Sequence, residues 1–189
     1  LGNLPLFEGK LTKYLWSRVL LLNAIGNEYD ELVEYILPSI DVNDGWARIN
    51  ERLPRMSFAK ILSNKHFVAS DYARRELLLE IDVLVSIMLG ISITDLQTIY
   101  RLQFPVMKQY EEDTWYDIDG KIVYTCNKNI PSLSRKEWED KKEQSQISTM
   151  VECNNENETR EKEIVFKAPF ICADRLNDYE EAWGVGIDY

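Results

Sequence analysis

Residues Asp71–Gly90 read DYARRELLLEIDVLVSIMLG, and this stretch decides the fold. One helical face carries the apolar residues Leu77, Leu78, Ile81, Leu84, Val85 and Met88, and the opposite face carries Leu79, Val83 and Ile87. A helix that is apolar on two faces is covered on most sides. Ser70 or Asp71 can cap its first amides, and Gly90 is a natural end. We therefore predict that Asp71–Gly90 is the central buried helix of the chain.

Charged residues interrupt this helix, and Asp82 is the most informative because it lies in the middle. The charged set is Arg74, Arg75, Glu76, Glu80 and Asp82. A carboxylate left unpaired in an apolar interior costs several kcal/mol. We expect Asp82 to be paired, with Arg101 or a capping amide as its partner, and to fix packing rather than to take part in catalysis.

Helical spacing also occurs on both sides of the central stretch. Before it, the pattern predicts helices at Leu11–Ile25, Tyr29–Leu37, Trp46–Leu53 and Ser57–Leu62. After it, Ser92 can cap a helix that runs to Phe104 and restarts after Pro105. The expected inward residues are Leu15, Val19, Leu22 and Ile25 in the first helix, and Leu96, Ile99, Tyr100, Gln103 or Phe104, Val106, Met107 and Tyr110 in the later ones.

Beyond Trp115 the pattern changes from helical to alternating. Asp119-Gly120 separates two aromatic and β-branched runs, which is a hairpin signal. A Ser134/Glu137 capping box predicts a charged helix, and a second hairpin and a short closing helix are expected at 147–167 and 173–183. The fold class is thus α+β. Residues 1–114 form a helical bundle, and residues 115–189 form a small antiparallel sheet with short helices, packed on it as one unit.

Composition restricts the class of protein. The chain has 189 residues, of which 45% are hydrophobic, and its three cysteines show no C-x-x-C pattern. A cytoplasmic location fits best, and Glu80 and Asp82 argue against a membrane span. The chain starts at Leu1 and its first residues resemble the interior of a polypeptide, so we expect part of a larger protein. It contains no glycine-rich nucleotide-binding motif, and we expect no cofactor.

Acidic residues are concentrated in the second part of the chain. Residues 1–110 carry 12 Lys/Arg and 13 Asp/Glu, whereas residues 111–189 carry 10 and 19. Nucleic-acid binding needs clustered basic side chains, so the second part is a poor DNA surface. The best candidate for DNA contact is the strip Arg48, Arg52, Arg55, Lys60 and Lys65, although a solvated helix flank is the favoured interpretation of these residues.

Two further clusters have alternative interpretations. Asp117 and Asp119 with Glu139-x-Lys141 match the spacing of metal-dependent nucleases, but here Glu139 falls in a helical pattern and not on a rigid strand. The acidic run at 111–113 lies next to aromatic residues that could form a docking surface, namely Trp115, Tyr116 and Tyr124. The simpler interpretation is a charged helix end. The single histidine, His66, receives no role.

Three blocks resemble the C-terminal region of large adenine-specific DNA methyltransferases of restriction-modification and phage-defence systems. They are LLEIDVLVSIMLGISITDLQTIYRLQFPVMKQYEEDTWYDIDGKIVYT (78–125), EIVFKAPF (163–170) and ADRLNDYEEAW (173–183). In that family a glycine-rich stretch follows the first block, and this chain has NKNIPSLSRKEWEDK instead.

The resemblance implies a non-catalytic C-terminal module that assists target recognition or docks onto the catalytic part of the same polypeptide. The glycine motif and the Asn-Pro-Pro-aromatic motif of such enzymes are absent from these residues. The resemblance therefore assigns no catalytic residue and no cofactor to this chain. The alternatives are a protein-interaction module of a defence complex and a metal-dependent nuclease.

Overall fold

A computed structural model describes residues 9–64, 68, 70–128, 130–155 and 158–188. Its α-helices are α1 (Thr12–Asn23), α2 (Asp30–Ile36), α3 (Phe58–Ser63), α4 (Asp71–Met88), α5 (Ile93–Gln103), α6 (Pro105–Glu112), α7 (Arg135–Lys141) and α8 (Arg175–Ile187). Its strands are β1 (Thr114–Tyr116), β2 (Ile122–Thr125), β3 (Gln146–Asn155), β4 (Glu158–Lys167) and β5 (Ile171–Cys172). Short 3-10 turns, η1 (Asn27–Tyr29) and η2 (Leu37–Ser39), flank α2. The α+β prediction is confirmed.

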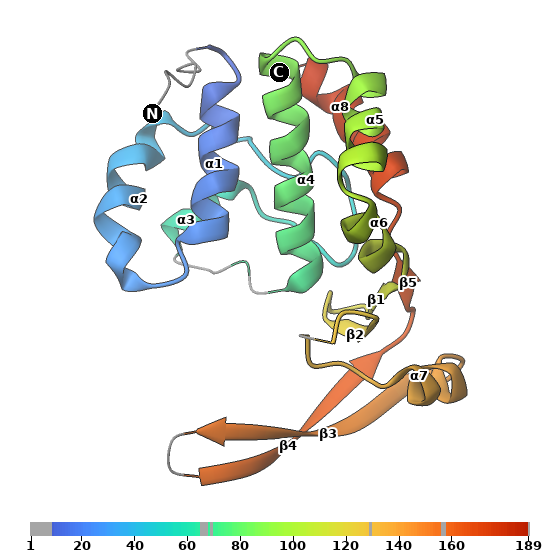
Figure 1. The fold of residues 1–189 in the computed structure, drawn as a ribbon. Coiled ribbons are helices and arrows are strands. Elements are labelled where there is room, and N and C mark those ends of the chain that lie inside the picture. Colours follow the sequence, from blue (N-terminus) through green and yellow to red (C-terminus); the bar gives the residue numbers. More distant parts are fainter. Residues whose placement is uncertain (1–8, 65–67, 69, 129, 156–157, 189) are drawn as a thin grey trace.

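Helix α4 stands at the centre of the bundle (Figure 1). Helix α1 packs on one side of it and α8 on the other, with α5 beside α8. The Ser70 hydroxyl accepts a hydrogen bond from the Ala73 amide at 3.2 Å, and Gly90 follows the last turn with a φ of 69°. Both predicted ends of the central helix are therefore confirmed. Helix α8 is thus one of the helices of the bundle. The C-terminal part of the chain, expected to form the sheet with short helices, also contributes a helix to the bundle.

The predicted Asp119-Gly120 hairpin is confirmed, and it anchors the sheet to the start of α4. Strand β1 pairs antiparallel with β2 on one side and β5 on the other. Gly120 has a φ of 78°, and its carbonyl accepts from the Tyr72 amide at 2.9 Å. A Cβ atom at Gly120 would lie 2.9 Å from the Ser70 hydroxyl. Glycine is thus required here for both conformation and space.

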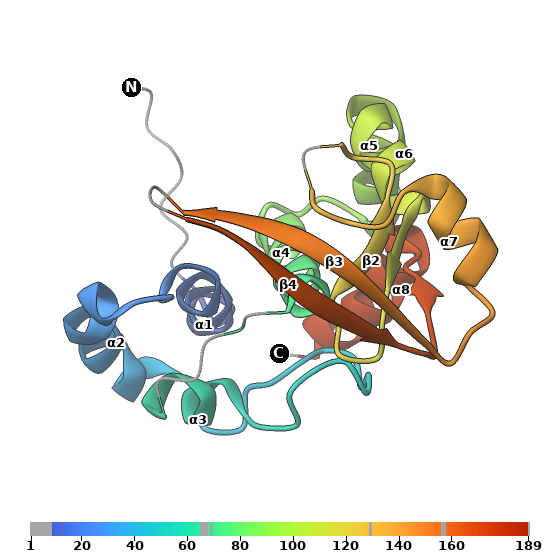
Figure 2. The same cartoon turned by 90° about the horizontal axis from the view of Figure 1, so that it is seen from below.

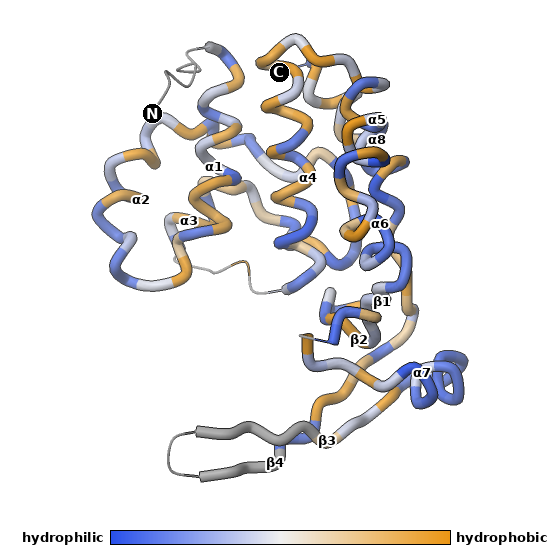
Figure 3. Tube along the Cα trace, viewed as in Figure 1, coloured by the Kyte–Doolittle hydropathy of each residue, from blue (hydrophilic) through white to orange (hydrophobic). Residues whose placement is uncertain are grey.

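The second hairpin and α7 lie below the helices in Figure 1, and Figure 2 shows that the hairpin runs across this end of the bundle. Strands β3 and β4 pair only with each other among the described residues, in register from Gln146↔Lys167 to Asn155↔Glu158. The Ser134/Glu137 capping box opens α7 as predicted. Helix α7 is hydrophilic along most of its length (Figure 3), and Trp138 is its buried residue.

The predicted helix at Trp46–Leu53 is wrong, because this segment is an irregular loop. The Trp46 ring packs edge-on against Phe58, and its indole N–H donates to the Pro54 carbonyl at 3.1 Å. Arg48 and Arg52 reach into the protein from this loop and bind groups on distant elements. These internal contacts outweigh the helical periodicity of three apolar residues.

The predicted inward face of α1 is also wrong in part. Val19 and Ile25 are 41% and 56% exposed, whereas Arg18 is 1% exposed. The Arg18 guanidinium donates to Glu80 at 2.8 Å and to both carboxylate oxygens of Asp44 at 2.9 Å. The buried face of α1 is therefore the one that carries Arg18, and not the face that the apolar residues alone would predict. The two carboxylates compensate the buried positive charge.

The core prediction for α4 can be tested by substitution. Leu84 is 2% exposed. Replacing it with alanine removes apolar contacts and leaves a cavity, so Leu84→Ala should lower the free energy of unfolding by about 2–5 kcal/mol. Urea denaturation followed by circular dichroism measures this loss. Leu78→Ala on the same helix is the control, because Leu78 is 50% exposed and its truncation should cost much less. Equal losses would show that α4 is wrongly oriented.

Among the described residues, no helix is both long enough and apolar enough to cross a membrane.

Candidate functional site

Several predicted inward residues of α4, α5 and α6 are exposed instead, and Leu78, Ile99 and Phe104 among them line an open groove. The exposed large apolar residues of these helices and their ends are Leu78, Leu89, Ile99, Leu102, Phe104, Val106 and Tyr110, with exposed fractions from 40% to 71%. The prediction that Ile99, Phe104, Val106 and Tyr110 face inward is thus corrected. These residues are exposed because α5 packs on α8 through Leu96 and Tyr100, which leaves the other side of α5 uncovered.

The groove has a volume of about 470 Å³. One wall is a stripe of α4 and its end, formed by Leu78, Asp82, Val85 and Leu89. The opposite wall comes from α5 and α6 and the residue between them, with Ile99, Tyr100, Phe104 and Met107 among its residues. Arg175 and Tyr179 of α8 also contribute to the lining. The groove is therefore mostly apolar, with its charged and phenolic groups supplied by α4, α5 and α8.

The α4 stripe follows directly from helical spacing. Leu78, Asp82, Val85 and Leu89 are separated by four, three and four residues. Side chains at these offsets lie above one another on one helix face, as in the contact seam of a coiled coil. The stripe is about 16 Å long at a rise of 1.5 Å per residue. Apolar groups occupy both ends, and the Asp82 carboxylate interrupts the seam.

Two side chains from the first turns of α8 bind the Asp82 carboxylate. Its Oδ2 atom accepts from the Tyr179 hydroxyl at 2.8 Å and from Arg175 Nη1 at 3.0 Å. The Asp82 side chain nevertheless remains 43% exposed. Burial raises the pKa of Asp82, although the Tyr179 hydrogen bond and the Arg175 charge act in the opposite direction. Pairing of Asp82 is as predicted, but its partner is Arg175 and not Arg101.

Arg175 connects three helices. Its guanidinium donates to both oxygens of Glu111 on α6 at 2.7 Å, in addition to Asp82 on α4. The Tyr100 hydroxyl donates to the same Glu111 carboxylate at 2.6 Å. Burial alone would raise the pKa of Glu111, but hydrogen bonds and charge from Arg175 hold it below its usual range. Burial raises the pKa of Tyr179 and Tyr100 well above the usual value, so both phenols stay protonated and act as donors.

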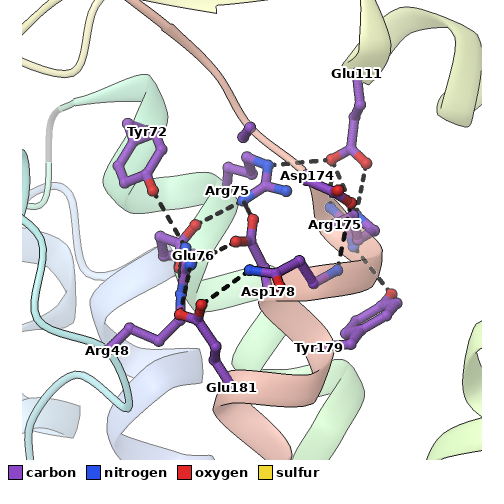
Figure 4. A network of polar contacts seen from close by, with 12 residues as sticks. Arg48, Tyr72, Arg75, Glu76, Glu111, Asp174, Arg175, Asp178, Tyr179 and Glu181 are labelled. Atoms are coloured by element: carbon purple, nitrogen blue, oxygen red, sulfur yellow. Dashed lines mark hydrogen bonds and ion pairs between the residues drawn. The ribbon is translucent and has the colours of Figure 1, made fainter.

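The Arg175 contacts belong to a larger charge cluster that lies between α4, α8 and the loop that carries Arg48 (Figure 4). Arg75 binds Glu76 at 2.6 Å and Asp178 at 2.8 Å. Arg48, from the loop after residue 45, binds Glu76 at 2.8 Å and also contacts Asp178 and Glu181. The cluster therefore ties the loop, α4 and α8 into one unit. Its side chains are committed to internal pairs, which makes its role structural.

The predicted DNA strip is not formed as a surface. Arg52 is buried, and its guanidinium donates to the carbonyls of Asp117 at 2.8 Å and Pro169 at 2.6 Å. Arg48 is engaged in the charge cluster. Arg55 and Lys60 are exposed, and Lys65 lies outside the described residues. Buried ion pairs cannot release counterions from phosphate, so only scattered basic side chains remain from the expected strip.

This arrangement predicts weak binding of the chain to duplex DNA. The net charge of −10 opposes association with phosphate, and two of the five expected arginine and lysine contacts are internal. Fluorescence anisotropy with a random duplex at low salt should give a Kd weaker than about 1 µM. Submicromolar binding that persists in an Arg55→Ala/Lys60→Ala variant would show that another surface contacts DNA.

The predicted aromatic docking surface is not formed either. Tyr116 and Tyr124 are buried, and Trp115 is half-buried. Tyr116 packs edge-on against Tyr72, and the Tyr124 ring stacks on Trp138. These rings connect the sheet to α4 and to α7. They were expected at the surface because the sequence does not show which face of a short strand is covered.

The nuclease-like cluster does not assemble. Asp117 is buried, and its carboxylate accepts from the Lys121 amide within the hairpin turn and from the Lys167 amide at the end of β4. Glu139 lies on exposed α7 and pairs with Lys142 at 2.7 Å. In the part of the chain that the structure describes, no group of three or more His, Cys, Asp or Glu residues could hold a metal ion.

Sequence reasoning missed the partners of the charged α4 residues. A signal was present, because a helix covered on most sides must bury at least some of its five charged side chains. Glu80 pairs with Arg18 and Glu76 pairs with Arg48. On α8, Asp178 pairs with Arg75 and Arg175 pairs with Asp82. Those pairings join residues more than 25 positions apart, which periodicity cannot detect.

No family model, curated protein or solved structure matches this chain.

Proposed function

We propose that this chain is a non-catalytic docking module of an adenine methyltransferase-type DNA-modifying protein of a restriction or phage-defence system. The exposed apolar face around the α4–α6 groove carries this proposal. Large contiguous apolar surfaces on folded domains mark sites of protein association. The family assignment rests on the resemblance of the three sequence blocks, and the docking role rests on the groove.

The internal charge cluster supports a rigid docking unit. Arg175, Glu111 and Asp82 fix the positions of α8, α6 and α4 relative to one another. Both groove walls are therefore preorganised, which lowers the entropic cost of binding a partner. The partner in this proposal is the catalytic part of the same polypeptide or a subunit of the same defence complex. Any contact with DNA is indirect or weak.

Adenine methylation by the larger protein tests the proposal. The complete polypeptide that contains this chain should transfer a methyl group from S-adenosylmethionine to adenine in duplex DNA, and the isolated chain should not. A Leu78→Glu/Leu89→Glu variant should lose at least about tenfold in activity or in association with the catalytic part, because two charges enter an apolar interface. Tyr35→Glu on α2 is the control, since Tyr35 is 83% exposed on another element.

Two results would contradict this function. A complete polypeptide that has no adenine methylation under any condition that supports DNA binding would remove the family assignment. Unchanged activity and unchanged association in Leu78→Glu/Leu89→Glu would remove the docking role of the groove. Both substituted leucines are about half exposed, so the variant should fold, and its thermal unfolding provides the check.

A further inference from the structure

We infer that the α4–α6 groove binds an amphipathic α-helix of a protein partner, and that this helix presents one lysine or arginine to Asp82. The inference rests on the docking role proposed above and specifies the chemistry of the partner. It follows from three properties of the groove, which are its length, the spacing of its residues and its charge.

The length and spacing fit a helix. The α4 stripe of Leu78, Asp82, Val85 and Leu89 covers about three turns. Its four-three-four spacing is that of a seam into which the side chains of a neighbouring helix insert. The second wall, from α5 and α6, provides Ile99, Phe104 and Met107. A helix that lies between the walls would contact apolar groups on both sides along its length.

The charge of the groove selects a cationic residue. The connected cluster contains three guanidinium groups and five carboxylates. Its members are Arg48, Arg75, Arg175, Glu76, Asp82, Glu111, Asp178 and Glu181. Carboxylates are thus in excess in this cluster. Of its members, Asp82 and Arg175 line the groove, and the positive charge of Arg175 is shared with Glu111. Asp82 is the charged residue that interrupts the seam. A partner that buried Asp82 without a cation would leave excess negative charge in an apolar interface, which is costly.

Geometry leaves Asp82 able to accept this cation. Both of its donors, Arg175 and Tyr179, bind Oδ2, and among the described residues no donor binds Oδ1. Because the side chain is 43% exposed, a lysine or arginine can approach it from the groove. A single polar pair inside an apolar seam fixes the register of the two helices. Asp82 therefore sets specificity, while the apolar residues supply most of the buried area.

A selection with helical peptides tests the inference. The probe is a displayed library of amphipathic peptides of about 18 residues, randomised at the positions of one apolar seam. Selection uses the 189-residue chain, and in parallel its Asp82→Asn, Leu89→Glu and Tyr35→Glu variants. Asparagine keeps an acceptor for Arg175 and Tyr179 but removes the negative charge. Thermal unfolding of each variant checks that it is folded.

The expected result has three parts. Peptides selected on the unchanged chain should carry lysine or arginine at one fixed seam position, flanked by apolar residues. Their affinity should fall at least about tenfold with Asp82→Asn and with Leu89→Glu, and stay unchanged with Tyr35→Glu. Replacing the selected cation by glutamine should cause the same loss on the unchanged chain and no further loss on Asp82→Asn.

Other outcomes would overturn the inference and are separable from a failure of the proposed function. If the selected peptides show no preference for a cation but lose binding with Leu89→Glu, Asp82 has no role in recognition, and the groove remains a docking site. No selected peptide, or binding insensitive to Leu89→Glu, would exclude a helix in the groove. If sedimentation shows that the chain forms dimers that Leu89→Glu abolishes, the occupant is a second copy of the chain. Methylation by the complete polypeptide is measured independently of all three.

Discussion

Arg18→Ala should destabilise the protein by about 3–5 kcal/mol, because it removes the cation from a buried ionic cluster. Arg18 is 1% exposed and binds Asp44 and Glu80, which are themselves buried. Without it, two carboxylates would remain in the interior without a positive partner. Urea denaturation measures the loss. Lys13→Ala on the same helix is the control, since the Lys13–Asp41 pair lies at the surface and its loss should change the stability very little.

The pH dependence of this loss gives a second measure. Burial raises the pKa of both Asp44 and Glu80, against the opposing effect of Arg18. A carboxyl with a raised pKa in the folded state binds more protons folded than unfolded, so its stability contribution increases as the pH falls through that pKa. Removing Arg18 raises both pKa values further. The deficit of Arg18→Ala should therefore shrink between neutral and mildly acidic pH, and a constant deficit would contradict this explanation.

Arg175→Ala should have a comparable effect, about 3–5 kcal/mol, because Glu111 and Asp82 would lose their shared partner. Arg175 is buried and joins α8 to α4 and α6. Arg101→Ala is the matched control. Arg101 is the partner that the sequence suggested for Asp82, and it is exposed on α5, so its loss should stay within about 0.5 kcal/mol. Thermal and urea unfolding compare the two variants, and a larger effect for Arg101→Ala would reverse the assignment.

Local signals predicted most elements well. Ser70, Ser92 and Ser134 each cap a helix as expected, because a side-chain cap depends on residues only three positions apart. The Asp119-Gly120 turn depends on backbone conformation, which glycine reports directly. The start and end of the central helix were predictable for the same reason. Elements that local chemistry defines can thus be found from one sequence.

The orientation of the elements was less predictable. On α1 the buried side is set by Arg18, whose partners lie in the loop at Asp44 and on α4 at Glu80. The apolar pattern alone favoured Val19 and Ile25, which are exposed. The expected basic strip is not formed for a similar reason, because Arg48 binds distant carboxylates and Arg52 binds distant carbonyls. Charged residues with long-range partners determine these orientations, and a periodicity argument treats them as solvent-exposed.

The groove could not be predicted from the sequence either. A helical pattern identifies apolar faces but does not show whether another element of the chain covers them. Ile99 and Phe104 belong to such a face, and in the described structure they stay open. The groove depends on how α5 packs against α8, and the helical pattern of α5 does not specify this packing. An apolar face without an internal partner is the feature that points to an external one.

Amide hydrogen exchange of α4–α6 tests the docking role most directly. The experiment compares the isolated chain with the larger polypeptide or complex proposed above, under identical conditions. The docking account predicts slower exchange at Ile93–Glu112 and around Leu89 in the larger assembly, because a partner covers the groove and suppresses local opening. Helices α2 and α3 should exchange equally in both. Identical exchange at Ile93–Glu112 in the two states would contradict the account.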